Sequence, residues 1–364
     1  MKKHSFLFLL LAVAVMTMLL NSCTEIPYMV HCAKGHLQLL SKRQPVEKVL
    51  NDPGCQPQLK HQLETSQLIR DFASRELLLP DNGSYRSYAD LERPYAVWNV
   101  VAAPEFSLTP VQWCFPFAGC VSYRGYYTQE KARRFAEKLQ EQGKDVYLYG
   151  VAAYSTLNWF DDPLLNTFSN DPAPDLAGLI FHELAHQLLY IKGDSFFNEA
   201  FAQTVERAGV LRWLDTYGTV EEQAWHANRS RREEDFLALI GQTRQELVDL
   251  YGAGLPEAAM RQGKEDILKT LRHRYEELRQ AWGGYRGYDR WFEKDLNNAR
   301  FVSIDTYRRY VPAFEALLRR SGGDLRQFYA LSRRLSELPQ ADRSVRLEAL
   351  LKEAGEGEVL AAAP

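Results

Sequence analysis

Apolar side chains recur every three or four residues through most of the chain, which is the spacing of amphipathic helices. In the N-terminal part this spacing predicts two helices, over 35–50 and 57–79, and the turn that begins at Pro80 ends the second. Beyond residue 194 it predicts a nearly continuous series of helices, over 195–213, 221–250, 256–282, 289–297, 306–318 and 324–335. The longest of these helices predict helical hairpins.

A different pattern occupies the middle of the chain. The runs YAVWNVVAA (95–103) and DVYLYGVAAY (145–154) are rich in β-branched and aromatic residues, which predicts strands. The amphipathic segment 129–142 between them predicts a helix that covers the sheet. The fold class is therefore α+β, predominantly α-helical, with a small sheet and a helical C-terminal half.

The first 22 residues have the pattern of an export signal. Lys2 and Lys3 precede an apolar run from Phe6 to Leu20 that is short for a membrane span, which needs about 20 residues. The end of the signal, LNSC, resembles a bacterial lipobox, in which Cys23 becomes the lipidated first residue; ordinary cleavage nearby is the alternative. Threonine, and not aspartate, follows Cys23, which by resemblance to the lipoprotein sorting rule favours the outer membrane. We therefore expect an outer-membrane lipoprotein on the periplasmic side of a Gram-negative envelope, held to the membrane by a lipid anchor.

The composition and net charge argue against nucleic acid as a partner. The 364 residues are 46% hydrophobic and 25% charged, as in a folded globular protein, and the formal net charge is −3. No overall positive field attracts nucleic acid. The oligomeric state stays open.

Export to an oxidising compartment makes the cysteines informative. Cys114 and Cys120 flank a turn that contains Pro116 and Gly119, which predicts a local disulfide; two buried thiols are the alternative. Whether Cys32 and Cys55 form a second bridge is left open.

The chemistry of the chain is concentrated in FHELAHQLLYIKGDSFFNEAFAQTVE (181–206). His182 and His186 lie four residues apart and share one face of a predicted helix that ends at Gly193. This is the H-E-x-x-H arrangement, in which two imidazoles bind zinc and Glu183 accepts a proton from the metal-bound water.

A hairpin at Gly193 adds the acid that such a site requires. Glu199 lies six residues after the turn and His186 seven before it, so the two face each other and Glu199 becomes the third ligand of one Zn²⁺ ion. Glu206, two turns further on, is placed to orient a histidine through the ring nitrogen that does not bind metal. The alternative is a buried polar cluster without metal. Manganese or cobalt could occupy the same ligands in vitro.

HELAH followed by NEAFAQTVE resembles the gluzincin metallopeptidases, most closely the aminopeptidase-N-like enzymes. The resemblance implies the same roles for His182, His186, Glu199, Glu183 and Glu206, although the connection after His186 is shorter here and the G-x-M-E-N segment that binds the substrate amine is missing. A tyrosine often stabilises the oxyanion in similar enzymes, which makes Tyr154 and Tyr307 candidates. Asp161 and Asp162 are candidates for binding the amine; a capped turn before Pro163 is the alternative.

A wider resemblance covers nearly the whole mature chain. Blocks such as WCFPFAGCVSYRGYY and AYSTLNWFDDPLL are similar to the proteobacterial putative aminopeptidase family of exported zincin-like lipoproteins. The resemblance implies a zincin-like core and a zinc-dependent aminopeptidase that acts on peptides. An endopeptidase of the same chemistry and a non-catalytic, zinc-stabilised lipoprotein that binds a protein partner are the alternatives.

These patterns divide the chain into five parts. They are a signal peptide of the lipoprotein type (1–22), an N-terminal helical segment (23–92), a zincin-like catalytic core (93–215), a helical C-terminal region (216–352) and a disordered tail (353–364).

Overall fold

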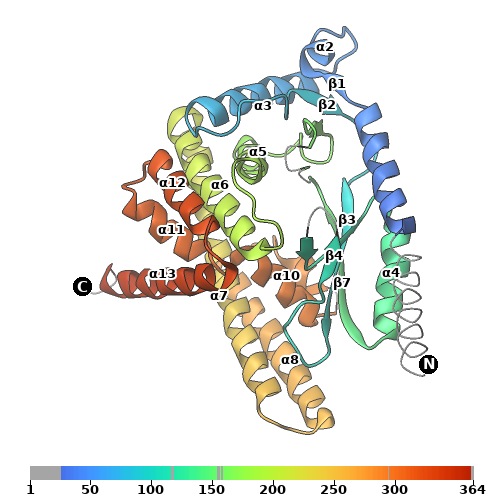
Figure 1. Cartoon of the computed structure of the whole chain (residues 1–364), viewed down its shortest axis with the longest axis vertical. Helices are drawn as coiled ribbons and strands as arrows, with labels where there is room; N and C mark the ends of the chain where they lie inside the picture. Colours follow the sequence, from blue (N-terminus) through green and yellow to red (C-terminus); the bar gives the residue numbers. More distant parts are fainter. Residues whose placement is uncertain (1–25, 116–118, 154–155, 157–158, 294, 362–364) are drawn as a thin grey trace, which may run out of the picture.

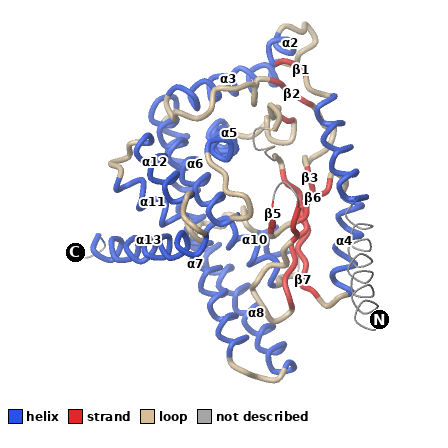
Figure 2. The backbone as a smooth tube through the Cα atoms, in the orientation of Figure 1, coloured by secondary structure: helices blue, strands red, loops and turns tan. Residues whose placement is uncertain are grey.

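The computed structural model describes residues 26–361 except 116–118, 154–155, 157–158 and 294; the side chains of 305–308 and 354–361 are also left undescribed. Cys23 and the export signal lie outside the described residues. Helices dominate, and the strands are gathered on one side of the molecule (Figure 2). The predicted α+β class is confirmed. None of the helices in the described part of the chain is both long and apolar enough to cross a bilayer.

The central sheet is antiparallel, and its strand order is β6-β3-β7. β3 (Val97–Pro104) lies between β6 (Arg124–Tyr126) and β7 (Lys144–Val151), so the two predicted strands pair with each other. α4 (Gln129–Glu141) packs on one face through Ala132, Ala136 and Leu139, and α10 (Asn298–Arg308) packs on the other. Because both faces are covered, β3 is apolar along nearly its whole length.

Two smaller sheets flank this one. β1 (Gln44–Pro45), β2 (Ser87–Ala89) and β8 (Leu164–Leu165) form a sheet in the order β1-β2-β8. β4 (Trp113–Phe115) and β5 (Gly119–Val121) form a hairpin, in which Cys114 and Cys120 lie opposite each other and are joined by a disulfide. Cys32 and Cys55 are not joined in this way.

The prediction of one helix over 35–50 is wrong. A helix over 26–41 ends before β1, and α2 (Val46–Leu50) follows after it. The reason is Pro45, which disfavours helical backbone at the preceding residue and cannot donate a helical hydrogen bond. α3 (Pro57–Arg75) is present, four residues shorter than predicted.

The helices after the sheet form two hairpins and a terminal group (Figure 1). α5 (Ala173–Leu188) and α6 (Ser195–Tyr217) form the first hairpin, and α7 (Val220–Gly252) and α8 (Glu257–Ala281) form a longer one that projects away from the rest. The others are α9 (Asp289–Glu293), α11 (Val311–Arg320), α12 (Leu325–Ser336) and α13 (Gln340–Ala361). α13 runs to Ala361, into the tail that was predicted to be disordered, and its earlier part packs in the core through Leu347 and Leu350.

One core joins segments that the sequence assigned to different parts. Leu63 of α3, Phe181 of α5, Phe201 of α6, Phe314 of α11 and Leu350 of α13 belong to the same buried cluster. The C-terminal helices therefore support the α5–α6 hairpin directly. A second cluster, around Phe236 and Tyr275, holds the α7–α8 hairpin together.

Candidate metal centre

The α5–α6 hairpin is fixed at its turn by local hydrogen bonds. Gly193 adopts a positive φ of 82°, which suits glycine, and the Asp194 side chain accepts a hydrogen bond from the backbone N–H of Phe197 at 3.1 Å to cap α6. Asn198 accepts a hydrogen bond from the backbone N–H of Ile191 and donates one to its carbonyl, both at 2.8 Å. Sequence reasoning gave Asn198 no role. It lies next to Glu199 and locks the connection that brings α6 back along α5.

The hairpin brings the three predicted metal ligands together. Nε2 of His182 and Nε2 of His186 are 3.1 Å apart, and Oε2 of Glu199 lies 3.3 Å from the first and 3.6 Å from the second. All three side chains are largely buried, with exposed fractions of 15%, 8% and 13%. This His182–His186–Glu199 group can hold a metal ion.

The spacing and the donor atoms fit zinc. In a tetrahedral site with bonds of about 2.0–2.1 Å, neighbouring ligand atoms are about 3.3–3.4 Å apart, close to the three distances here. Nδ1 of His182 lies 2.9 Å from Oε2 of Glu206, and a carboxylate only accepts, so Nδ1 carries the hydrogen and Nε2 of the neutral ring turns its lone pair to the centre. The lone pair on Nε2 of His182 then faces the Glu199 carboxylate, with Nε2 of His186 beside them. A bound cation would satisfy them together.

The electrostatics of the metal-free site agree with this interpretation. Burial favours neutral His182, but its hydrogen bonds with Glu199 and Glu206 outweigh burial and raise its pKa well above the usual value. Burial also works to raise the pKa of Glu199, but the two histidines lower it to about 2. Without metal, a proton on His182 supplies part of the positive charge that the carboxylates require. Metal binding must displace it.

Glu183 lies beside the triad and has a different environment. Burial raises the pKa of its carboxyl, and the adjacent histidines only partly oppose this. A carboxylate whose pKa is raised toward neutrality is a better proton acceptor than an ordinary glutamate. Glu183 and His182 each line two cavities.

The first cavity, which we call the sheet-side cavity, has a volume of about 420 Å³. Asn99 and Val151 of the central sheet line one wall, and the three metal ligands line the other. Tyr123 and Tyr190 also line it, and burial together with the Glu199 carboxylate raises the pKa of each, so both keep their hydroxyl proton.

Neither of these two tyrosines was predicted, and the structure does not test the two that were. Tyr154 lies outside the described residues, and Tyr307 belongs to α10 but its side chain is not described. Tyr123 lies in a short connection between β5 and β6, far from the motif in sequence, so no local pattern could identify it. Tyr190 follows α5 directly, and its ring lies 6.3 Å from that of His186.

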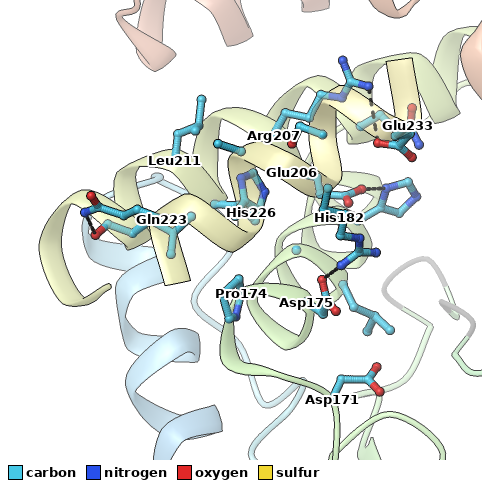
Figure 3. A pocket seen from close by; sticks show the side chains of 18 of the residues that line it. Asp171, Pro174, Asp175, His182, Glu206, Arg207, Leu211, Gln223, His226 and Glu233 are labelled. Atoms are coloured by element: carbon cyan, nitrogen blue, oxygen red, sulfur yellow. Dashed lines mark hydrogen bonds and ion pairs between the residues drawn. The ribbon is translucent and has the colours of Figure 1, made fainter. Parts of the chain in front are cut away.

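The second cavity, the helix-side cavity, has a volume of about 790 Å³ and lies between α5, α6 and α7 (Figure 3). Eight carboxylates and two guanidinium groups line it in the described part of the chain. The acids are Asp171, Asp175, Glu183, Glu206, Asp215, Glu233, Glu234 and Glu315. Arg207 bonds Glu315 at 2.8 Å and Arg229 pairs with Asp175, which leaves a large excess of negative charge beside the metal triad.

The aspartates predicted as amine-binding groups lie elsewhere. Asp162 is buried and accepts a hydrogen bond from the backbone N–H of Thr156 at 3.0 Å. Neither Asp161 nor Asp162 lines the two cavities at the triad. Asp162 therefore organises a turn.

Comparison with known proteins identifies the family. The sequence profile of the family described as "Putative aminopeptidase" matches residues 27–347, which is most of the chain. Searches of curated proteins and of solved structures found no match. The chain belongs to this family.

Proposed function

Starting from this family membership, we propose that the protein is a zinc-dependent aminopeptidase. The observation that carries the proposal is the triangle of His182, His186 and Glu199, whose sides of 3.1–3.6 Å suit a tetrahedral zinc ion, with Glu183 beside it. The family description supports hydrolysis of peptides, and the donor set supports zinc.

Each residue of the site has a separate role in hydrolysis. Zinc bound to the triad would supply a water of lowered pKa and polarise the peptide carbonyl. Glu183 accepts a proton from the attacking water and passes it to the nitrogen of the leaving amine. The Tyr123 hydroxyl donates a hydrogen bond to the oxygen that becomes negative. Glu206 holds His182 through Nδ1 in the tautomer that turns Nε2 to the metal.

The helix-side cavity supports an exopeptidase over an endopeptidase. An aminopeptidase must bind the α-ammonium group of its substrate, and no acid besides Glu183 and Glu199 lines the sheet-side cavity among the described residues. The helix-side cavity provides a surplus of carboxylates next to His182 and Glu183. We place the α-ammonium group there.

The location of the enzyme is part of the same proposal. The charged start, apolar run and Cys23 of the N-terminus support export and a lipid anchor, and so a site of action at the periplasmic face of the outer membrane. Metabolic labelling with a radioactive fatty acid, with Cys23→Ala as control, tests the anchor. Labelling that persists in Cys23→Ala would count against it.

The decisive experiment measures metal content and hydrolysis on the same purified protein. We expect about one zinc per chain, chelator-sensitive cleavage of short peptides, and loss of cleavage when the peptide N-terminus is acetylated. Cleavage of acetylated peptides at an undiminished rate would indicate an endopeptidase. Stoichiometric zinc without cleavage of any peptide in a broad library would indicate a non-catalytic lipoprotein.

A further inference from the structure

A third cavity, of about 320 Å³, has walls that are mainly aromatic. We call it the aromatic cavity. Five rings line it, and they come from three regions of the chain: Tyr147 and Tyr149 of β7, Phe236 of α7, and Tyr288 and Trp291 at α9. The Tyr147 and Tyr149 rings stack at 4.9 Å, and Phe236 stacks on Tyr288 at 4.3 Å. Such walls favour a flat apolar group.

Two elements place the aromatic cavity close to the metal triad. On β7, Val151 lines the sheet-side cavity and Tyr149, two residues away on the same face, lines the aromatic cavity; two residues of strand span about 6.6 Å. On α6, Glu199 is a metal ligand and Gln203, one turn further, lines the aromatic cavity; four residues of helix span about 6 Å. The distance suits the side chain of a residue next to a bond that is cleaved at the triad.

The charges around the aromatic cavity favour an uncharged aromatic side chain over a positively charged one. Aromatic walls can also attract a cation, but the Arg300 guanidinium already lies 4.5 Å from the Tyr147 ring and 5.6 Å from the Trp291 ring. Arg300 is buried, so a second positive group at these rings would meet direct repulsion. Among the described residues one acid lines the cavity, Glu233, and it is 3.8 Å from Arg207.

We infer that the aromatic cavity receives an aromatic side chain of the substrate peptide, from a residue adjacent to the scissile bond. The inference rests on the proposed function, because a peptide held at the triad is what delivers the side chain. It makes the protein selective for peptides with phenylalanine, tyrosine or tryptophan at that position.

The test varies the residue on each side of the scissile bond among phenylalanine, leucine, lysine and alanine. We expect kcat/KM for phenylalanine to exceed that for alanine by about 10- to 100-fold at one of the two positions. Ser303→Phe on α10 fills the cavity and should abolish this preference while metal content and cleavage of the alanine peptide are kept. Leu237→Trp fills it from α7, on the other wall, in case the first variant does not fold.

The matched control is Ser336→Phe. Like Ser303, Ser336 donates its hydroxyl to the carbonyl three residues earlier in a helix, but it lies on α12 and lines none of the three cavities. It should leave the preference intact. Equal rates for phenylalanine and alanine at both positions, a preference for lysine, or an unchanged preference in both cavity-filling variants would overturn the inference.

A binding measurement separates this inference from the proposed function. Calorimetry on the metal-free wild-type protein uses N-acetylphenylalaninamide and N-acetylalaninamide as probes. Binding of the first alone, and its loss in Ser303→Phe, supports the cavity even if no peptide is cleaved. Cleavage of peptides without preferential binding of N-acetylphenylalaninamide would support the proposed peptidase function and overturn the aromatic subsite.

Discussion

The two cavities that meet at His182 and Glu183 differ in origin and in charge. The helix-side cavity is built almost entirely from residues 171–234, and carboxylates line it. The sheet-side cavity collects residues from Tyr28 to Glu199, and tyrosines and apolar side chains dominate its walls. The metal triad lies at their border. Under the proposed function, the helix-side cavity would bind the positive charge of the substrate and the sheet-side cavity would hold the peptide backbone and the developing oxyanion.

The largest effect on metal binding and hydrolysis is expected for a change in the His182–His186–Glu199 group. Glu199→Ala removes one of three ligands and leaves two, so bound metal should fall to background and hydrolysis should disappear. Mass spectrometry of the purified variant measures the metal. Glu234→Ala, an exposed acid at the helix-side cavity, is the control and should keep it. Full retention of metal in Glu199→Ala would disprove the ligand assignment.

Glu183→Gln tests the group that belongs to both cavities. The amide cannot accept the proton of the attacking water, so kcat should fall about 10²–10⁴-fold while metal content stays at the wild-type level. Steady-state kinetics with parallel metal analysis checks both. A variant with wild-type kcat would assign the proton transfer to another residue.

Tyr123→Phe tests the sheet-side cavity alone. Removing one hydrogen-bond donor to an oxyanion typically lowers kcat about 10²–10³-fold. KM and metal content should change little. Tyr190→Phe is the comparison, because Tyr190 lines the same cavity. A large loss in Tyr190→Phe with none in Tyr123→Phe would exchange their roles.

Glu206→Gln tests the helix-side cavity. The change weakens the hydrogen bond that orients His182, and metal affinity should fall about 10- to 100-fold. Competition with a chelator of known affinity measures this. Glu315→Gln, which alters an acid of the same cavity that bonds Arg207 instead, should leave metal affinity unchanged.

The smallest effect concerns the metal-free protein. The folded-state pKa of His182 is raised, so its charged form adds stability below its ordinary pKa of 6.5, and this contribution is lost as the pH rises through the folded-state pKa. The free energy of unfolding of chelated wild type should therefore decline above pH 6.5 relative to His182→Gln. Parallel pH profiles for the two proteins would contradict the pKa shift.

Local pattern was sufficient where the relevant groups are close in sequence. The two predicted strands, the motif helix and the hairpin that brings Glu199 to the histidines follow from periodicity, turn residues and the rise of a helix. The same reasoning failed over 35–50, where Pro45 breaks the helical pattern. The same reasoning did not single out Tyr123, because strand pairing far from the motif in sequence brings it to the wall of the sheet-side cavity.

By itself the sequence identified the three members of the His182–His186–Glu199 group and Glu183 beside them, because one helical turn and one short hairpin bring these residues near one another. Only the tertiary structure decided which tyrosines line the sheet-side cavity. It also decided that carboxylates line one flanking cavity while tyrosines and apolar side chains dominate the other, and that β7, α7 and α9 contribute the rings of an aromatic cavity. The reason is physical: those walls come from segments up to 171 residues apart, from Tyr28 to Glu199, and burial of a shared core, which no local spacing encodes, sets their relative positions.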